Sequence, residues 1–102
     1  MPMIRVPSAM RTLTRGAAEI EVEAATVRDA LVELDRLHPG LAMKILDAAG
    51  SVKPFIRIYV GADDITSLQG LDTKLSARDE VQIIPAIAGG GEGPALLAPR
   101  GR

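Results

Sequence analysis

The chain has 102 residues, a formal net charge of −1 at pH 7 and no cysteine. This length suits one compact domain, and the near-neutral charge gives no electrostatic attraction to nucleic acid or to an anionic membrane. Disulfides and cysteine metal sites are excluded, and no apolar run approaches the roughly 20 residues of a membrane span, so we expect a single cytoplasmic domain.

Two alternating segments predict an opening β-hairpin. Residues 4–6 alternate apolar and charged side chains, and residues 19–24 place Ile20 and Val22 on one face. The opposite face of the second segment carries Glu19, Glu21 and Glu23. Like charges on one strand suit the edge of a sheet, because they oppose pairing with a second copy of the same strand.

The next segment is expected to be the main helix. Thr26 is typical of a helix N-cap, with Asp29 as a weak capping-box partner. Apolar residues then recur at helical spacing, at Val27, Ala30, Leu31, Leu34 and Leu37. The helix must end before Pro39, because proline disfavours helical geometry at His38. Residues 41–46 are expected to add one further helical turn.

The second half of the chain predicts two more strands. Residues 54–60 alternate strongly, with Ile56, Ile58 and Val60 on one face and Phe55, Arg57 and Tyr59 on the other. Residues 61–64 are interpreted as a turn, residues 65–75 as an irregular crossing and residues 76–80 as a polar turn. Residues 81–84 form the last predicted strand, which Pro85 ends because proline donates no ladder hydrogen bond.

This order of elements predicts an α+β domain in which one main helix packs on one face of a mixed sheet of four to five strands. The domain is expected to span residues 1–88. Glycine and proline dominate residues 89–102, which we interpret as a flexible tail.

The last predicted strand runs directly into Ala86-Ile87-Ala88-Gly89-Gly90. In this context the sequence resembles the ubiquitin-like β-grasp sulfur carriers, a family that includes the molybdopterin synthase small subunit, the thiazole-pathway carrier and the CysO-type carrier. The resemblance covers residues 1–90, and the Pro85–Gly90 segment is most similar to the CysO type. It implies the β-grasp fold, with the first and last strands parallel at the centre.

The resemblance also implies a chemistry. In this family a ubiquitin-activating-type enzyme uses ATP to adenylate the terminal glycine, which then becomes a thiocarboxylate that delivers sulfide to a synthase. On this chain Gly90 would carry the sulfur, Gly89 would allow threading, and Ile87 and Ala88 would set the approach. The chain would itself be no enzyme and bind no cofactor, and the acceptor pathway would make cysteine, a cofactor or another metabolite.

Residues 91–102 depart from the family pattern, because carriers of this kind usually end at the diglycine. The resemblance implies removal of these residues by a JAB-type metallopeptidase between Gly90 and Gly91. Two alternatives remain open at this point. The trimmed Gly90 could be joined to lysine as in a ubiquitin-like modifier, or the chain could be an uncut β-grasp binding module.

A partner surface is the remaining prediction. If the helix covers the face of Ile56, then Phe55, Arg57 and Tyr59 lie on the open face, where an aromatic–arginine cluster would suit a docking partner. Loops or the tail could equally cover these side chains. No metal site is expected, because the single histidine, His38, lies far along the chain from Asp63 and Asp64.

Overall fold

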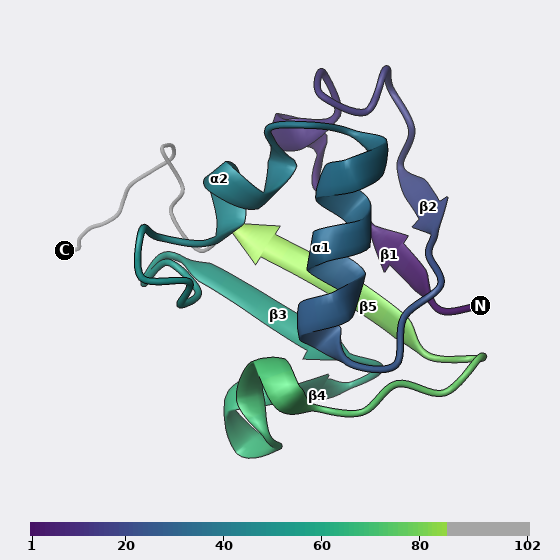
Figure 1. The fold of residues 1–102 in the computed structure, drawn as a ribbon, viewed down its shortest axis with the longest axis vertical. Coiled ribbons are helices and arrows are strands. Elements are labelled where there is room, and N and C mark those ends of the chain that lie inside the picture. Colours follow the sequence, from purple (N-terminus) through teal and green to yellow (C-terminus); the bar gives the residue numbers. More distant parts are fainter. Residues whose placement is uncertain (86–102) are drawn as a thin grey trace, which may run out of the picture.

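The computed structural model describes residues 1–85, and it has two layers, a mixed sheet with α1 lying across one face (Figure 1). The elements are β1 (Met3–Arg5), β2 (Glu19–Glu21), α1 (Val27–Leu37), α2 (Leu41–Ile45), β3 (Ile56–Val60), β4 (Asp63–Asp64) and β5 (Glu80–Pro85). Short 3₁₀ turns occur at Ser8–Met10, Ile65–Ser67 and Gly70–Asp72. The predicted tail and the last residues of the predicted domain lie outside the described residues.

The sheet has five strands in the order β2-β1-β5-β3-β4. β1 and β5 are parallel neighbours, with Ile4 opposite Val81, and the other three pairings are antiparallel. β2 folds back on β1 with Ile20 opposite Ile4, so the predicted opening hairpin is confirmed. The predicted β-grasp arrangement, with the first and last strands side by side, is also confirmed.

The ends of α1 follow the local chemistry of the sequence. The Thr26 hydroxyl accepts a hydrogen bond from the Asp29 amide at 3.1 Å, which satisfies one free donor of the first turn. The helix ends at Leu37, before the proline, as predicted. Gly40 then adopts a φ of 103°, a left-handed conformation that glycine tolerates best. The Asp35 carboxylate accepts from the amides of Gly40 and Ala42, both at 3.1 Å, and so fixes α2 against α1.

The core lies between α1 and the sheet. Leu31 and Leu34 of α1 pack against the strands with Ile4, Ile58 and Val81, and all of these are almost fully buried. Burying one such side chain contributes roughly 1.5–3 kcal/mol. Leu37, predicted on the same stripe, is 41% exposed because it lies in the last turn of α1.

Two local predictions were wrong. Asp63 and Asp64 form β4, antiparallel to the end of β3, where only a turn was expected. A strand of this length has too few residues to show a period. Phe55 lies in a turn before β3, since the Ile56 amide donates to the Lys53 carbonyl at 3.0 Å and closes that turn.

No helix among residues 1–85 combines the length and the apolar character needed to cross a lipid bilayer.

Candidate functional site

The predicted functional segment, residues 86–90, directly follows Pro85, which we call the root of this segment. Pro85 is the last residue of β5 and lies opposite Ile56, the first residue of β3. The predicted sulfur-bearing and threading residues Ile87, Ala88, Gly89 and Gly90, and the cleavage position at Gly91, lie outside the described residues. The site is therefore built from the side chains that surround Pro85.

Arg57 and Tyr59 lie on the open face of the sheet. Their neighbour Ile58 is buried under the helix, and side chains alternate between the two faces of a strand. Arg57 is exposed and lies opposite Ile84, while Tyr59 is half-buried and lies opposite Gln82. The prediction that these two side chains face away from the helix is confirmed. Ile84, whose facing the sequence did not settle, shares their face.

Phe55 stands apart from this pair. The residue is 37% exposed, and the Lys53 ammonium nitrogen lies 6.0 Å from the centroid of its ring. At this distance a cation and an aromatic face attract each other weakly at an exposed site. A role for Phe55, Arg57 and Tyr59 in binding a partner stays a prediction.

Arginines border the root on both sides. Arg57 on β3 lies opposite Ile84, and on the other side an open hollow of about 250 Å³ is lined by Arg5 and Arg11 together with Ile84 and Pro85. The Arg11 guanidinium donates from Nε to the Val6 carbonyl at 3.1 Å. Neither Arg5 nor Arg11 was predicted at this site, because only the pairing of β1 with β5 brings them beside the last strand.

Arg5 also holds the centre of the open face together. Its Nη1 lies 3.4 Å from Glu19 Oε2 on β2 and 3.1 Å from Glu80 Oε2 on β5. All three side chains are about half exposed, so each ion pair contributes little to stability, on the order of 0–1 kcal/mol. Their main effect is to neutralise this part of the face and to orient Arg5.

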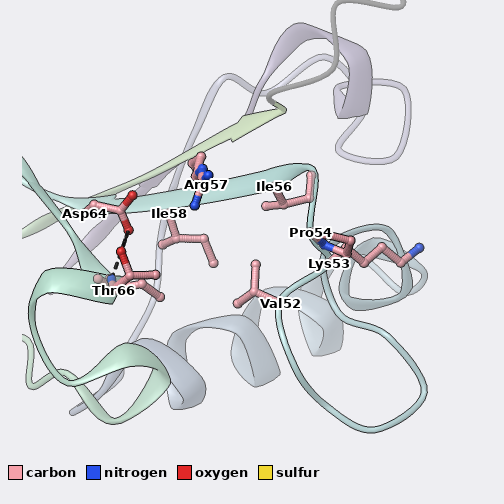
Figure 2. A pocket seen from close by; sticks show the side chains of 9 residues that line it. Val52, Lys53, Pro54, Ile56, Arg57, Ile58, Asp64 and Thr66 are labelled. Carbon is pink, nitrogen blue, oxygen red and sulfur yellow. Dashed lines mark hydrogen bonds between the residues drawn. The ribbon is translucent and has the colours of Figure 1, made fainter.

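A small apolar hollow lies at the outer side of β3. It measures about 130 Å³, and Figure 2 shows Val52, Ile56 and Ile58 pointing into it while Arg57 projects from the other side of the strand. Its volume suits one apolar side chain, since a cavity of roughly 150 Å³ can hold a benzene molecule. Apart from the alternation of Ile56 and Ile58, no sequence pattern indicates this hollow.

Asp64 forms part of the rim of this hollow. Its Oδ1 accepts hydrogen bonds from the Thr66 amide and the Thr66 hydroxyl, both at 2.9 Å. These two bonds lower the pKa of the Asp64 carboxyl below its ordinary value, and the positive charge of Arg57 adds a smaller effect in the same direction. The carboxylate is thus held charged beside Arg57.

Among residues 1–85, no group of three or more histidine, aspartate or glutamate side chains is placed to hold a metal ion. On the open face of the sheet, Arg57 and Ile84 lie next to Pro85, and Tyr59 lies further along β3, opposite Gln82.

Three comparisons place the chain among known proteins. A sequence model of the ThiS family matches residues 4–90. A protein of Archaeoglobus fulgidus named for sulfur carriage is 33% identical over 87 residues, which cover 85% of this chain and 96% of that protein. A chain in the crystal structure of the Amycolatopsis orientalis BexX/CysO complex is 28% identical, with a TM-score of 0.83, covering 88% of this chain and 100% of that one. The solution structure of small archaeal modifier protein 1 from Methanosarcina acetivorans is 25% identical, with a TM-score of 0.76, covering 87% of this chain and 95% of that one.

Proposed function

Because this chain belongs to the ThiS family, we propose that it is a sulfur carrier that works through a thiocarboxylate on Gly90. The observation that carries the proposal is the extent of the family match, which begins in β1 and ends on the second glycine of the diglycine. The match to relatives named as sulfur carriers covers 96% of the length of those proteins. Like them, the chain is a small protein carrier rather than an enzyme.

The chemistry requires a free carboxylate at Gly90. That carboxylate attacks the α-phosphorus of ATP and displaces pyrophosphate, which leaves an acyl adenylate. Hydrosulfide then attacks the acyl carbon, AMP departs as the leaving group, and loss of the sulfur's proton gives the thiocarboxylate. An adenylating enzyme of the ubiquitin-activating type supplies the ATP site, so the carrier needs no cofactor of its own.

The root geometry supports delivery of this terminus into a partner. Residues 86–90 can reach at most about 18 Å beyond Pro85, because an extended chain covers about 3.3–3.6 Å per residue. A partner whose active site receives Gly90 must therefore come close to Pro85, beside which Arg57 and Ile84 lie on the open face, with Tyr59 further along β3. Ordering the glycine-ended segment costs roughly 1–2 kcal/mol per residue, and contacts with this face would offset that cost.

Three partners follow from the proposal. Residues 91–102 must be removed before Gly90 can be adenylated, and a JAB-type metallopeptidase cutting between Gly90 and Gly91 would do this. An adenylating enzyme and a sulfur-accepting synthase act on the product. The synthase would serve the synthesis of cysteine, a cofactor or another metabolite, and the ATP requirement suits the cytoplasm. The known complex of CysO with BexX supports the idea that a carrier of this shape binds another protein.

The test uses the full chain and a form that ends at Gly90. Each is incubated with an activating enzyme, ATP and sulfide, and the intact mass is then measured. The form ending at Gly90 should exchange one oxygen for sulfur, whereas the full chain should not, because its Gly90 carbonyl is still an amide. Failure of the shorter form to gain sulfur would reject the proposal.

Likeness to the small archaeal modifier protein favours a second candidate function. A modifier would join Gly90 to a lysine amine of another protein instead of charging it with sulfur. Mass spectrometry of proteins from the native cell separates the two, since a modifier leaves Gly90 isopeptide remnants on lysine side chains. If the chain is instead an uncut binding module, deletion of residues 91–102 and Gly90→Ala should both leave its function unchanged.

A further inference from the structure

The outer edge of β2 is an open strand edge. Hydrogen bonds from the Val22 amide to Pro2 and from the Val6 amide to Ala18, at 3.0 and 2.8 Å, show which residues of this strand face β1. Backbone groups alternate between the two edges of an antiparallel strand. The amides and carbonyls of Glu19 and Glu21 therefore point away from the sheet, and Glu23 follows just beyond the end of β2. Among residues 1–85, none of these groups has a hydrogen-bond partner, and all three residues are exposed.

Acidic side chains surround this edge. Glu19 and Glu21 lie on the open face, because Ile20 between them is buried, and Glu23 follows where the chain turns towards α1. An open hollow of about 500 Å³ between this segment and α1 is lined by Glu23, Asp29 and Glu33 together with Ala24, Ala25 and Val32. The hollow thus joins the strand edge to an acidic stretch of α1.

Several of these carboxylates lack a compensating cation. Glu19 is paired with Arg5, and Glu33 is paired with Arg36. Within the described part of the chain, Glu21, Glu23 and Asp29 form no ion pair. In the middle of the acidic surface Val32 is 64% exposed, which provides one apolar contact beside the charges.

We propose that the outer edge of β2 binds an extended segment of a partner protein, with lysine or arginine at alternate positions, as an additional strand of the sheet. The free amides and carbonyls would form the ladder, which is how an extended peptide adds to a sheet edge. One face of the added strand would place its cations beside Glu19 and Glu21. Its other face would place a small apolar side chain against Val32.

Charge decides between the possible occupants. A second copy of this chain would bring glutamates against glutamates, and like charges directly opposite each other on neighbouring strands are destabilising. The acidic edge therefore disfavours pairing of copies while it attracts a basic strand. The edge lies two strands away from β5, so this contact is separate from the open face around Arg57.

The test is a titration of the full chain with a capped peptide of about seven residues, close to an ordinary strand length, that alternates lysine and valine. Backbone amides are followed by NMR and by hydrogen exchange. The amides of Glu19, Glu21 and Glu23 should shift and become protected, whereas those of Ile20 and Val22 should change little because they already face β1. Binding should weaken as salt is raised.

Matched variants make the test specific. The double change Glu21→Gln and Glu23→Gln should weaken binding roughly three- to tenfold, since each opposite-charge pair across strands contributes a modest amount. Asp63→Asn, on the edge strand at the other side of the sheet, should leave binding unchanged. The proposal is overturned if millimolar peptide causes no shift, if shifts occur without protection, or if a glutamate–valine peptide binds equally well. Protection of the same amides without peptide, rising with protein concentration, would assign the edge to a second copy instead.

Discussion

Pro85 and Ile56 form the last rung between β5 and β3, and this pairing fixes where the diglycine segment begins. Proline has no amide hydrogen, so the ladder cannot continue through it in the usual way. β5 therefore ends beside the start of β3, next to the open-face side chain of Arg57. A partner that captures the glycine-ended segment within its reach of Pro85 meets this face first.

The docking face can be tested by truncating its side chains. Arg57→Ala and Tyr59→Ala should each lower kcat/KM for thiocarboxylate formation by about tenfold, mainly through KM, because docking and not chemistry is lost. Intact mass measures the rate of thiocarboxylate formation over a range of carrier concentrations that saturates the activating enzyme, so that kcat and KM are obtained separately. Arg28→Ala provides the control, since Arg28 is an exposed arginine on α1 whose partner is Asp72. Equal rates for all three variants would place the docking surface elsewhere.

The core between α1 and the sheet gives a second prediction. Leu34→Ala should lower the free energy of unfolding by about 2–5 kcal/mol, because it removes a fully buried side chain from a packed core. Val32→Ala, two residues earlier on the same helix, should change it by less than about 0.5 kcal/mol, since that side chain is 64% exposed. Urea unfolding followed by circular dichroism measures both. Similar losses for the two variants would contradict the placement of α1.

The cap of α1 gives a third prediction. Thr26→Ala should cost about 1 kcal/mol of unfolding free energy, because the Asp29 amide then loses its hydrogen-bond acceptor. Thr12→Ala is the matched control, as Thr12 is exposed in a turn. Thr26→Ser should recover most of the loss, since serine offers the same hydroxyl. If serine and alanine are equally destabilising, the cap contributes nothing.

The depressed pKa of Asp64 gives a fourth prediction. A carboxyl whose pKa is lower in the folded chain than its ordinary 3.8 stabilises the fold above that value and loses this contribution as pH falls through the depressed value. Asp64→Asn should therefore be less stable than the parent near neutral pH, and the difference should shrink below about pH 4. Thermal unfolding from pH 2 to pH 7 measures this.

A second variant tests the cause of the lowered pKa of Asp64. Thr66→Val removes the hydroxyl donor and leaves the Thr66 amide in place, so it should move the pKa of Asp64 part of the way back to its ordinary value. Carbon-detected NMR titration of the carboxyl reports the pKa directly. An unchanged value in this variant would show that the hydroxyl bond does not hold the carboxylate.

Much of the fold was predictable because its signals are local. Thr26 and Pro39 bound α1, and the alternation around Ile20 and around Ile58 gives two strands and their buried faces. The parallel pairing of β1 with β5 was inferred only through the family resemblance, since periodicity does not order strands. β4 was missed because Asp63 and Asp64 are typical turn residues that become a strand only by pairing with β3.

The residues of the candidate site were likewise predictable only in part. Arg57 and Tyr59 were placed on the open face by their phase relative to Ile58. Phe55 shares that phase, but the turn closed at Lys53 excludes it from the strand. Arg5 and Arg11 could not be predicted, because they reach Ile84 and Pro85 from the opposite end of the chain. Contacts between residues this distant depend on topology, which no local pattern encodes.

The parallel contact between β1 and β5 also sets an order of events during synthesis. Met3 pairs with Glu80, and Ile4 pairs with Val81, so the centre of the sheet cannot form until β5 has been synthesised. A nascent chain still lacking β5 leaves β1 with β2 as its one neighbour and lacks Val81 and Ile83 of the core. Pairing across so long a stretch of chain is entropically slow. Synthesis must therefore pass β5 before the domain becomes stable, so the fold is completed only a few residues before the diglycine is made.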